Sequence, residues 1–163
     1  MKNLNHQQLK GLHHTAIRTG NLAESIRYYS DVLGLKEAFR LERDDGTVSI
    51  VYLIIAPGQY LELICERPSG KKRPRFLIRV KSVFQKYFSH SGILHICLVT
   101  EDIRRTYDGI LASGGPVDSE IKRGQSQCLR FWTHDPDGTP IEIMETPPAS
   151  MQAQADKRFT DPG

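Results

Sequence analysis

Four residues of metal-ligating type recur at equivalent positions in the two halves of the chain. A histidine lies near the start of each half and a glutamate near its end: His14 and Glu62 in the first half, His95 and Glu142 in the second. Imidazole nitrogen and carboxylate oxygen suit divalent ions such as Zn, Ni, Co, Mn or Fe(II), and they leave coordination positions open for water or substrate. Because the set contains no cysteine, a closed structural zinc site is disfavoured.

The neighbours of these residues predict where they point. Glu62 is flanked by Leu61 and Leu63, Glu142 by Ile141 and Ile143, and His95 by Leu94 and Ile96. Side chains alternate between the two faces of a strand. If the apolar flanks pack under helices, the two histidines and two glutamates project from the opposite face of the sheet. We expect two pseudo-symmetric sheets to aim all four at one cleft, where Glu142 is the preferred general base and Glu62 the second candidate.

Two alternatives accompany this interpretation. All four could be unrelated strand residues on solvated faces. His13 also adjoins His14, but neighbouring strand residues face opposite sides, so we expect only one of them to be a ligand. Alignment of the two halves places His14, not His13, at the position of His95. His13 is then expected at the core edge or in a hydrogen bond.

The elements that position these residues follow the order β-α-β-β-β twice. In the first half, Asn21 caps a helix that ends at Gly34, and in the second, Asp102 caps a helix that ends at Gly114 and Gly115. Alternation and turn residues predict the strands, at 11–19, 36–42, 48–56 and 59–65, then at 92–100, 117–121, 128–133 and 139–145. Two copies are too few for a solenoid, so we expect one pseudo-symmetric body.

This pattern divides the chain into five segments. Residues 1–10 are a loose arm, 11–66 the first module, 67–91 a basic connection, 92–146 the second module and 147–163 a polar tail expected to be poorly ordered. The basic connection lacks a nucleic-acid-binding motif and is predicted to be a solvated loop. No nucleic-acid partner is therefore expected.

Composition narrows the class of protein. The chain has 163 residues with 39% hydrophobic and 25% charged residues, which is ordinary for a globular protein. It has no apolar run of the roughly 20 residues needed to span a bilayer and no secretory leader, which favours the cytoplasm and no membrane partner. Cys65, Cys97 and Cys128 are odd in number and are expected as small core residues without disulfides.

Several strings together resemble the glyoxalase/bleomycin-resistance/dioxygenase family, also called vicinal oxygen chelate proteins. They are HHTAIR at 13–18, YYSDVLGL at 28–35, LEL at 61–63, HICL at 95–98 and DPDG at 135–138 followed by IEI at 141–143. The resemblance spans about residues 11 to 146. It implies an α+β fold of two tandem βαβββ modules that form a half-open, eight-stranded, barrel-like sheet around a metal cleft, and a homodimer.

The ligand pattern is similar to that of glyoxalase I, which isomerises the hemithioacetal of methylglyoxal and glutathione through an enediolate. The resemblance implies metal ligation by His14, Glu62, His95 and Glu142, and substrate binding by Arg18, which matches a glutathione-carboxylate arginine. Glu66 stands where bacterial relatives carry asparagine for glutathione, so metal chemistry on a small substrate is better supported than glutathione itself. The alternatives are an Fe(II) extradiol dioxygenase using His14, His95 and Glu142, and a metal-free binding or resistance protein.

Overall fold

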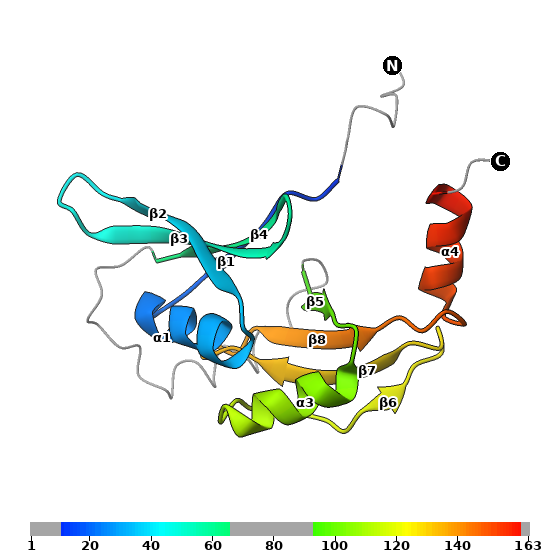
Figure 1. Cartoon of the computed structure of the whole chain (residues 1–163). Helices are drawn as coiled ribbons and strands as arrows, with labels where there is room; N and C mark the ends of the chain where they lie inside the picture. The colour runs from blue at the N-terminus through cyan, green and yellow to red at the C-terminus, as the bar shows by residue number, and fades with distance from the viewer. Residues whose placement is uncertain (1–10, 66–92, 161–163) are drawn as a thin grey trace, which may run out of the picture.

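Two β-α-β-β-β modules follow one another in the computed structural model of the chain, which describes residues 11–65 and 93–160. Each module forms a four-stranded sheet of mixed strand direction (Figure 1). The α+β class and the repeated element order predicted from the sequence are confirmed. The eight strands are divided between two sheets.

The two sheets share one topology. The first module contains β1 (His14–Arg18), α1 (Leu22–Arg27), η2 (Tyr28–Val32), β2 (Lys36–Glu42), β3 (Val48–Ala56) and β4 (Gln59–Ile64), with strand order β1-β4-β3-β2. The second contains β5 (Ile96–Val99), α3 (Ile103–Ala112), β6 (Lys122–Arg123), β7 (Leu129–His134) and β8 (Pro140–Glu145), with order β5-β8-β7-β6. In each module the first strand pairs in parallel with the last, so the histidine end of one lies beside the glutamate of the other.

Both helices begin at the predicted caps. The Asn21 side chain accepts a hydrogen bond from the Glu24 N–H, and Asp102 accepts one from the Arg105 N–H. These contacts satisfy backbone donors that the first helical turn leaves without partners. The first helix widens into the π-helical turn η2, and Gly34, at φ +75°, ends it as predicted.

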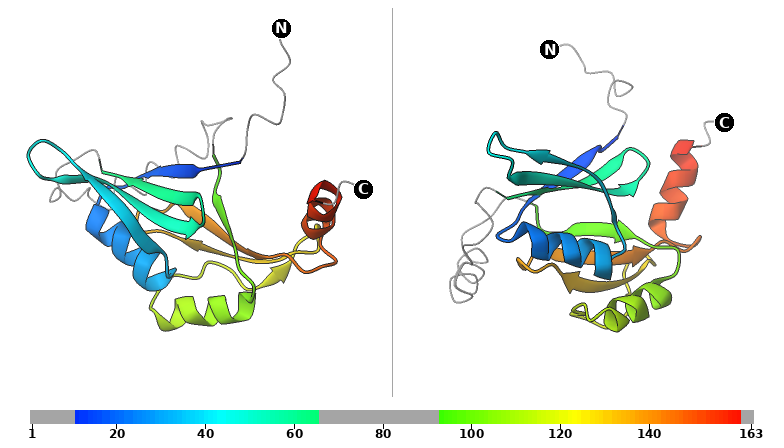
Figure 2. Two further views of the ribbon diagram at one scale, coloured as in Figure 1. Left: turned by 45° about the horizontal axis from the view of Figure 1, so that its top comes forward. Right: turned by 60° about the vertical axis from the view of Figure 1, so that its left-hand side comes forward.

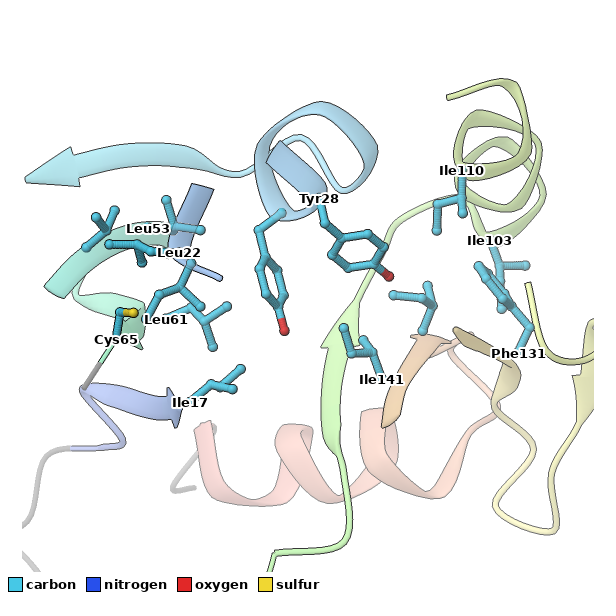
Figure 3. Close-up of a cluster of buried hydrophobic side chains, with 14 residues drawn as sticks. Ile17, Leu22, Tyr28, Leu53, Leu61, Cys65, Ile103, Ile110, Phe131 and Ile141 are labelled. Atoms are coloured by element: carbon cyan, nitrogen blue, oxygen red, sulfur yellow. The ribbon is translucent and has the colours of Figure 1, made fainter. Parts of the chain in front are cut away.

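The hydrophobic core is continuous across the two modules. The apolar residues of β4 and β8 that flank the glutamates are buried, with Leu61, Leu63, Ile141 and Ile143 at most 3% exposed. Tyr28 and Tyr29 of η2 belong to the same cluster. Figure 3 shows Tyr28 between side chains of the first sheet and Ile141 of the second. Burial of these flanks turns the alternating glutamates to the opposite face of each sheet, as the sequence predicts.

Contacts between the modules run through the start of the first helix and through η2. The Tyr29 hydroxyl donates to Asp135 Oδ2 over 2.9 Å, and the Gly20 N–H donates to the Asp137 carboxylate at 3.0 and 3.2 Å. Asp135 and Asp137 belong to the turn that precedes β8. The first module therefore braces the turn that begins the Glu142 strand.

Three local predictions are corrected. β5 begins only at Ile96, after His95, and Leu94 is 82% exposed instead of packed under a helix. The short strand expected at 117–121 forms instead as β6. The tail contains helix α4 (Met151–Thr160), which stands beside the second sheet (Figures 1 and 2).

The tail helix has local causes. Ser150 is fully buried and its hydroxyl accepts from the Ala153 N–H, as an N-cap does. Gln152 then contacts Cys128 and Ser126 of the second module. The predicted arm at 1–10 lies outside the described residues, and so does the basic connection at 67–91. No helix within residues 11–65 and 93–160 is long and apolar enough to cross a bilayer.

Candidate functional site

The first predicted pair, His14 and Glu62, meets on the face of the first sheet opposite its buried side. We call this face, and its counterpart on the second sheet, the site face. Nε2 of His14 lies 3.4 Å from Oε2 of Glu62. Tyr52 is the cross-strand partner of Glu62, so its side chain leaves the sheet on the same face. Desolvation and the nearby Glu62 carboxylate raise the pKa of Tyr52.

The second pair, His95 and Glu142, has the same arrangement. Nε2 of His95 lies 3.2 Å from Oε2 of Glu142, while Nη1 of Arg130 lies 3.3 Å from the other oxygen, Oε1. Cys97 is the register partner of Glu142, and its thiol lies on the same face as that carboxylate. Desolvation and the charge of Glu142 raise the pKa of Cys97 to about 12. His95 and Arg130 thus each hold one oxygen of Glu142.

The spacing within each pair fits two ligands of one metal ion. Imidazole nitrogen and carboxylate oxygen bind zinc at about 2.0–2.2 Å, so adjacent ligands of a tetrahedral or octahedral ion lie roughly 3–3.5 Å apart. The observed separations of 3.4 Å and 3.2 Å fall in this interval. Both pairs also turn the same atoms, Nε2 and Oε2, toward each other. Each pair could therefore supply two ligands to a divalent cation.

The four predicted ligands nevertheless form two separate pairs within one chain. In the described part of the chain, no three His, Cys, Asp or Glu side chains come close enough to hold one ion. The expectation that one chain aims all four at a single cleft is therefore not met there. The modules join through η2 and the turn before β8, and these contacts leave each pair on its own sheet.

Two further sequence predictions concern neighbours of His14. His13 precedes β1 instead of lying within it, and its Nδ1 lies 3.0 Å from Nδ1 of His14, so the two rings do not face opposite sides. The expectation that His13 makes a hydrogen bond is confirmed, although its partner is His14. Arg18 is the last residue of β1 and lies four residues after His14, so alternation places both on the site face. Its side chain is exposed.

Several site-face residues were not singled out from the sequence. Around the first pair, Phe39 stacks on Tyr52 with ring centres 4.4 Å apart, and Tyr60 contacts His13. Around the second pair, Trp132 packs edge-on against His95 at 4.9 Å. Alternation alone could have placed Trp132 opposite buried Phe131, but only the register of β7 against β8 shows that it lies beside Glu142. Cys97, expected in the core, is on this face instead.

Comparison with known proteins decides the family. The model of the Glyoxalase/Bleomycin resistance protein/Dioxygenase superfamily matches residues 11–143. The chain belongs to this superfamily. The match covers both modules and every predicted ligand, so the sequence resemblance is confirmed.

Among members of the superfamily, the lactoylglutathione lyase of Haemophilus influenzae is 31% identical over 134 residues, covering 81% of this chain and 90% of its own. A probable lactoylglutathione lyase of Synechocystis is 29% identical over 138 residues, covering 82% and 93%. A glyoxalase family protein of Enterococcus faecalis has a similar structure, with TM-score 0.63, 21% identity and coverage of 85% and 99%. This last likeness concerns the fold alone.

Proposed function

We propose that the protein is a divalent-metal-dependent enzyme of the lactoylglutathione lyase type, acting on a small substrate that binds through two adjacent oxygens. The observation that carries the proposal is the repeated His–Glu pair, with Nε2 and Oε2 3.4 and 3.2 Å apart on the two site faces. The names of the relatives favour the same chemistry.

We further propose that two copies of the chain complete each metal site. The His14–Glu62 pair of one protomer would join the His95–Glu142 pair of its partner, and a symmetric dimer would then hold two equivalent sites. Exposed apolar surface supports this arrangement. β2 is exposed along its whole length. Leu12, Ile93 and Leu94, next to the histidines, are 74%, 81% and 82% exposed. In the proposed dimer, the partner copy would cover these apolar side chains.

The roles of the residues follow from their contacts. A bound divalent ion would supply Lewis-acid polarisation of the two substrate oxygens. Glu142 is the proposed base that takes a proton from one substrate carbon and returns it to the next, with Glu62 as the second candidate. His95 and Arg130 each contact one oxygen of Glu142 and thereby orient it. Arg18, on the site face of β1, is the proposed contact for a substrate carboxylate.

Metal analysis followed by turnover tests the proposal. Protein purified without chelators should hold a divalent ion and turn over in a substrate screen of small molecules with two adjacent oxygens, led by methylglyoxal with glutathione. Glu142→Gln should keep part of the metal and lose most turnover, and His14→Ala should lose metal. His134→Ala is the matched control, because His134 pairs with Asp118 and not with a glutamate of the site.

Contrary outcomes are equally specific. A wild-type protein that takes up none of Ni, Zn, Co, Mn or Fe(II) would contradict the metal site. Full activity in Glu142→Gln would remove that residue from the role of base. Oxygen consumption with a catechol, in place of methylglyoxal turnover, would assign dioxygenase chemistry to the same ligands.

A further inference from the structure

Arg130 places a positive charge on the site face directly beside the second pair. It alternates along β7 with buried Phe131, and it reaches diagonally to Glu142 on β8, where its Nη1 lies 3.3 Å from Oε1. Its guanidinium carbon lies 5.9 Å from the centre of the Trp132 ring, close enough for a cation–π contact that restrains the group. The Arg130 side chain is 42% exposed, whereas that of Glu142 is 11% exposed. The cation is therefore accessible from the side on which a substrate would approach.

The two oxygens of Glu142 have different neighbours. Oε2 faces His95 and is the oxygen that suits a shared metal ion, while Oε1 faces Arg130. The contact with Oε1 uses one of the five N–H donors of the guanidinium. Once Glu142 also bound a divalent cation, its negative charge would be shared with that cation. Arg130 would then keep donors, and most of its charge, for another anion.

The surroundings strengthen the positive charge. Lys122 of β6 is the cross-strand partner of Arg130, so its side chain leaves the sheet on the same face. Gly124 lies under the Arg130 side chain, because a Cβ at this glycine would be 3.4 Å from Arg130 Nε. A guanidinium that is restrained and flanked by a second cation is suited to a planar anion such as a carboxylate, which it can bind with two parallel hydrogen bonds.

We infer that Arg130 is a specificity-determining residue that binds a carboxylate of the substrate next to the chelating oxygens. The substrate class is then a small acid with two adjacent oxygens. This inference rests on the proposed function and names its substrate more closely. A carboxylate could come from such an acid or from glutathione. Because Arg130 contacts Glu142 itself, the carboxylate that it binds lies close to the metal ligands, which favours the acid.

A matched pair of chelators isolates the contribution of Arg130. Acetohydroxamic acid and the monohydroxamic acid of succinic acid chelate metal with the same two oxygens, but only the second carries a carboxylate. Titration of each into zinc-loaded protein by calorimetry measures binding without turnover. Wild-type protein should bind the carboxylate-bearing hydroxamate about ten- to hundredfold more tightly, the range of a hydrogen bond to a charged group. S-methylglutathione, titrated in parallel, reports on glutathione as the alternative source of the carboxylate.

Substitutions then assign the preference to one side chain. Arg130→Gln should abolish the preference between the hydroxamates, and Arg130→Lys should keep only part of it, because lysine retains the charge but not the paired donors. Arg123→Gln is the matched control. It removes a neighbouring cation whose strand partner, Leu129, packs against the core, so Arg123 points away from the site face. This variant should keep the full preference.

The outcomes separate this inference from the proposed function. Equal binding of the two hydroxamates by wild-type protein, or a preference that survives in Arg130→Gln, would overturn the role of Arg130 while leaving the metal site intact. Loss of S-methylglutathione binding in Arg130→Gln, with an unchanged hydroxamate preference, would also overturn it and assign Arg130 to glutathione. Protein that holds no zinc and binds neither hydroxamate would overturn the proposed function and the inference together.

Discussion

Tyr29 and Tyr28 are adjacent tyrosines whose hydroxyl groups should differ measurably in their contribution to stability. Both side chains are buried, at 1% and 6% exposure. The Tyr29 hydroxyl donates to Asp135 Oδ2, and the other oxygen of that carboxylate accepts from the N–H groups of Asp137 and Thr139. Asp135 is itself 1% exposed. Removing the Tyr29 hydroxyl therefore leaves a buried carboxylate oxygen without this donor.

The matched change at Tyr28 has a smaller consequence. Its hydroxyl lies 2.9 Å from Thr133 Oγ1, and because the Thr133 hydroxyl donates to the Pro116 carbonyl, Tyr28 is the donor. Tyr28→Phe leaves a neutral hydroxyl that keeps its other bond. We expect a loss of about 0.5–1.5 kcal/mol for Tyr28→Phe and about 1.5–3 kcal/mol for Tyr29→Phe, since hydrogen bonds to charged groups contribute more.

Urea unfolding at one fixed protein concentration measures the difference. Trp132 is the single tryptophan and reports the transition by fluorescence. With an m-value of about 2 kcal/mol/M, Tyr29→Phe should lower the midpoint by about 1 M relative to wild type. Equal losses in the two variants, or a larger loss in Tyr28→Phe, would refute the account of Asp135 as a carboxylate that depends on Tyr29.

Two further predictions concern the same core. Desolvation raises the pKa of Tyr28 from 10.0 to about 12. The contribution of the protonated phenol to the free energy of unfolding is therefore complete below pH 10 and is lost as pH rises through 12. Tyr28→Phe should reduce the fall in the free energy of unfolding over this interval. In Gly115→Ala the added methyl group would collide with Val32, and overpacking should cost about 1–3 kcal/mol. Gly109→Ala is the control, because its Cβ meets open space in a helix, and it should stabilise by about 0.5–1 kcal/mol in the same urea assay.

Local sequence signals predicted the parts of the fold that depend on neighbouring residues. Asn21 and Asp102 cap the helices as expected, because an N-cap is a contact across three residues. Glu142 leaves the core where alternation places it, because Ile141 and Ile143 on either side are buried. These features need only the period of a strand and the chemistry of a helix end.

Contacts between distant segments were beyond the same reasoning. The proximity of Arg130 to Glu142 depends on the register of β7 against β8, which alternation leaves free to slip. The separation of the two His–Glu pairs depends on contacts such as Tyr29 with Asp135 that join the modules. Helix α4 was missed because its polar composition resembles a solvated tail, whereas buried Ser150 and the Gln152 contacts hold it in place.

The most direct test of the central claim is restoration of metal binding by mixing two defective variants. One variant carries His14→Ala and Glu62→Gln, and the other carries His95→Ala and Glu142→Gln, so neither should bind metal alone. After joint refolding, half of the dimers pair the two variants and rebuild one intact site each, so metal should return to about one quarter of the wild-type amount per chain. If metal stays absent from the mixture while wild-type protein refolded in parallel recovers its own, the site is not shared between two copies.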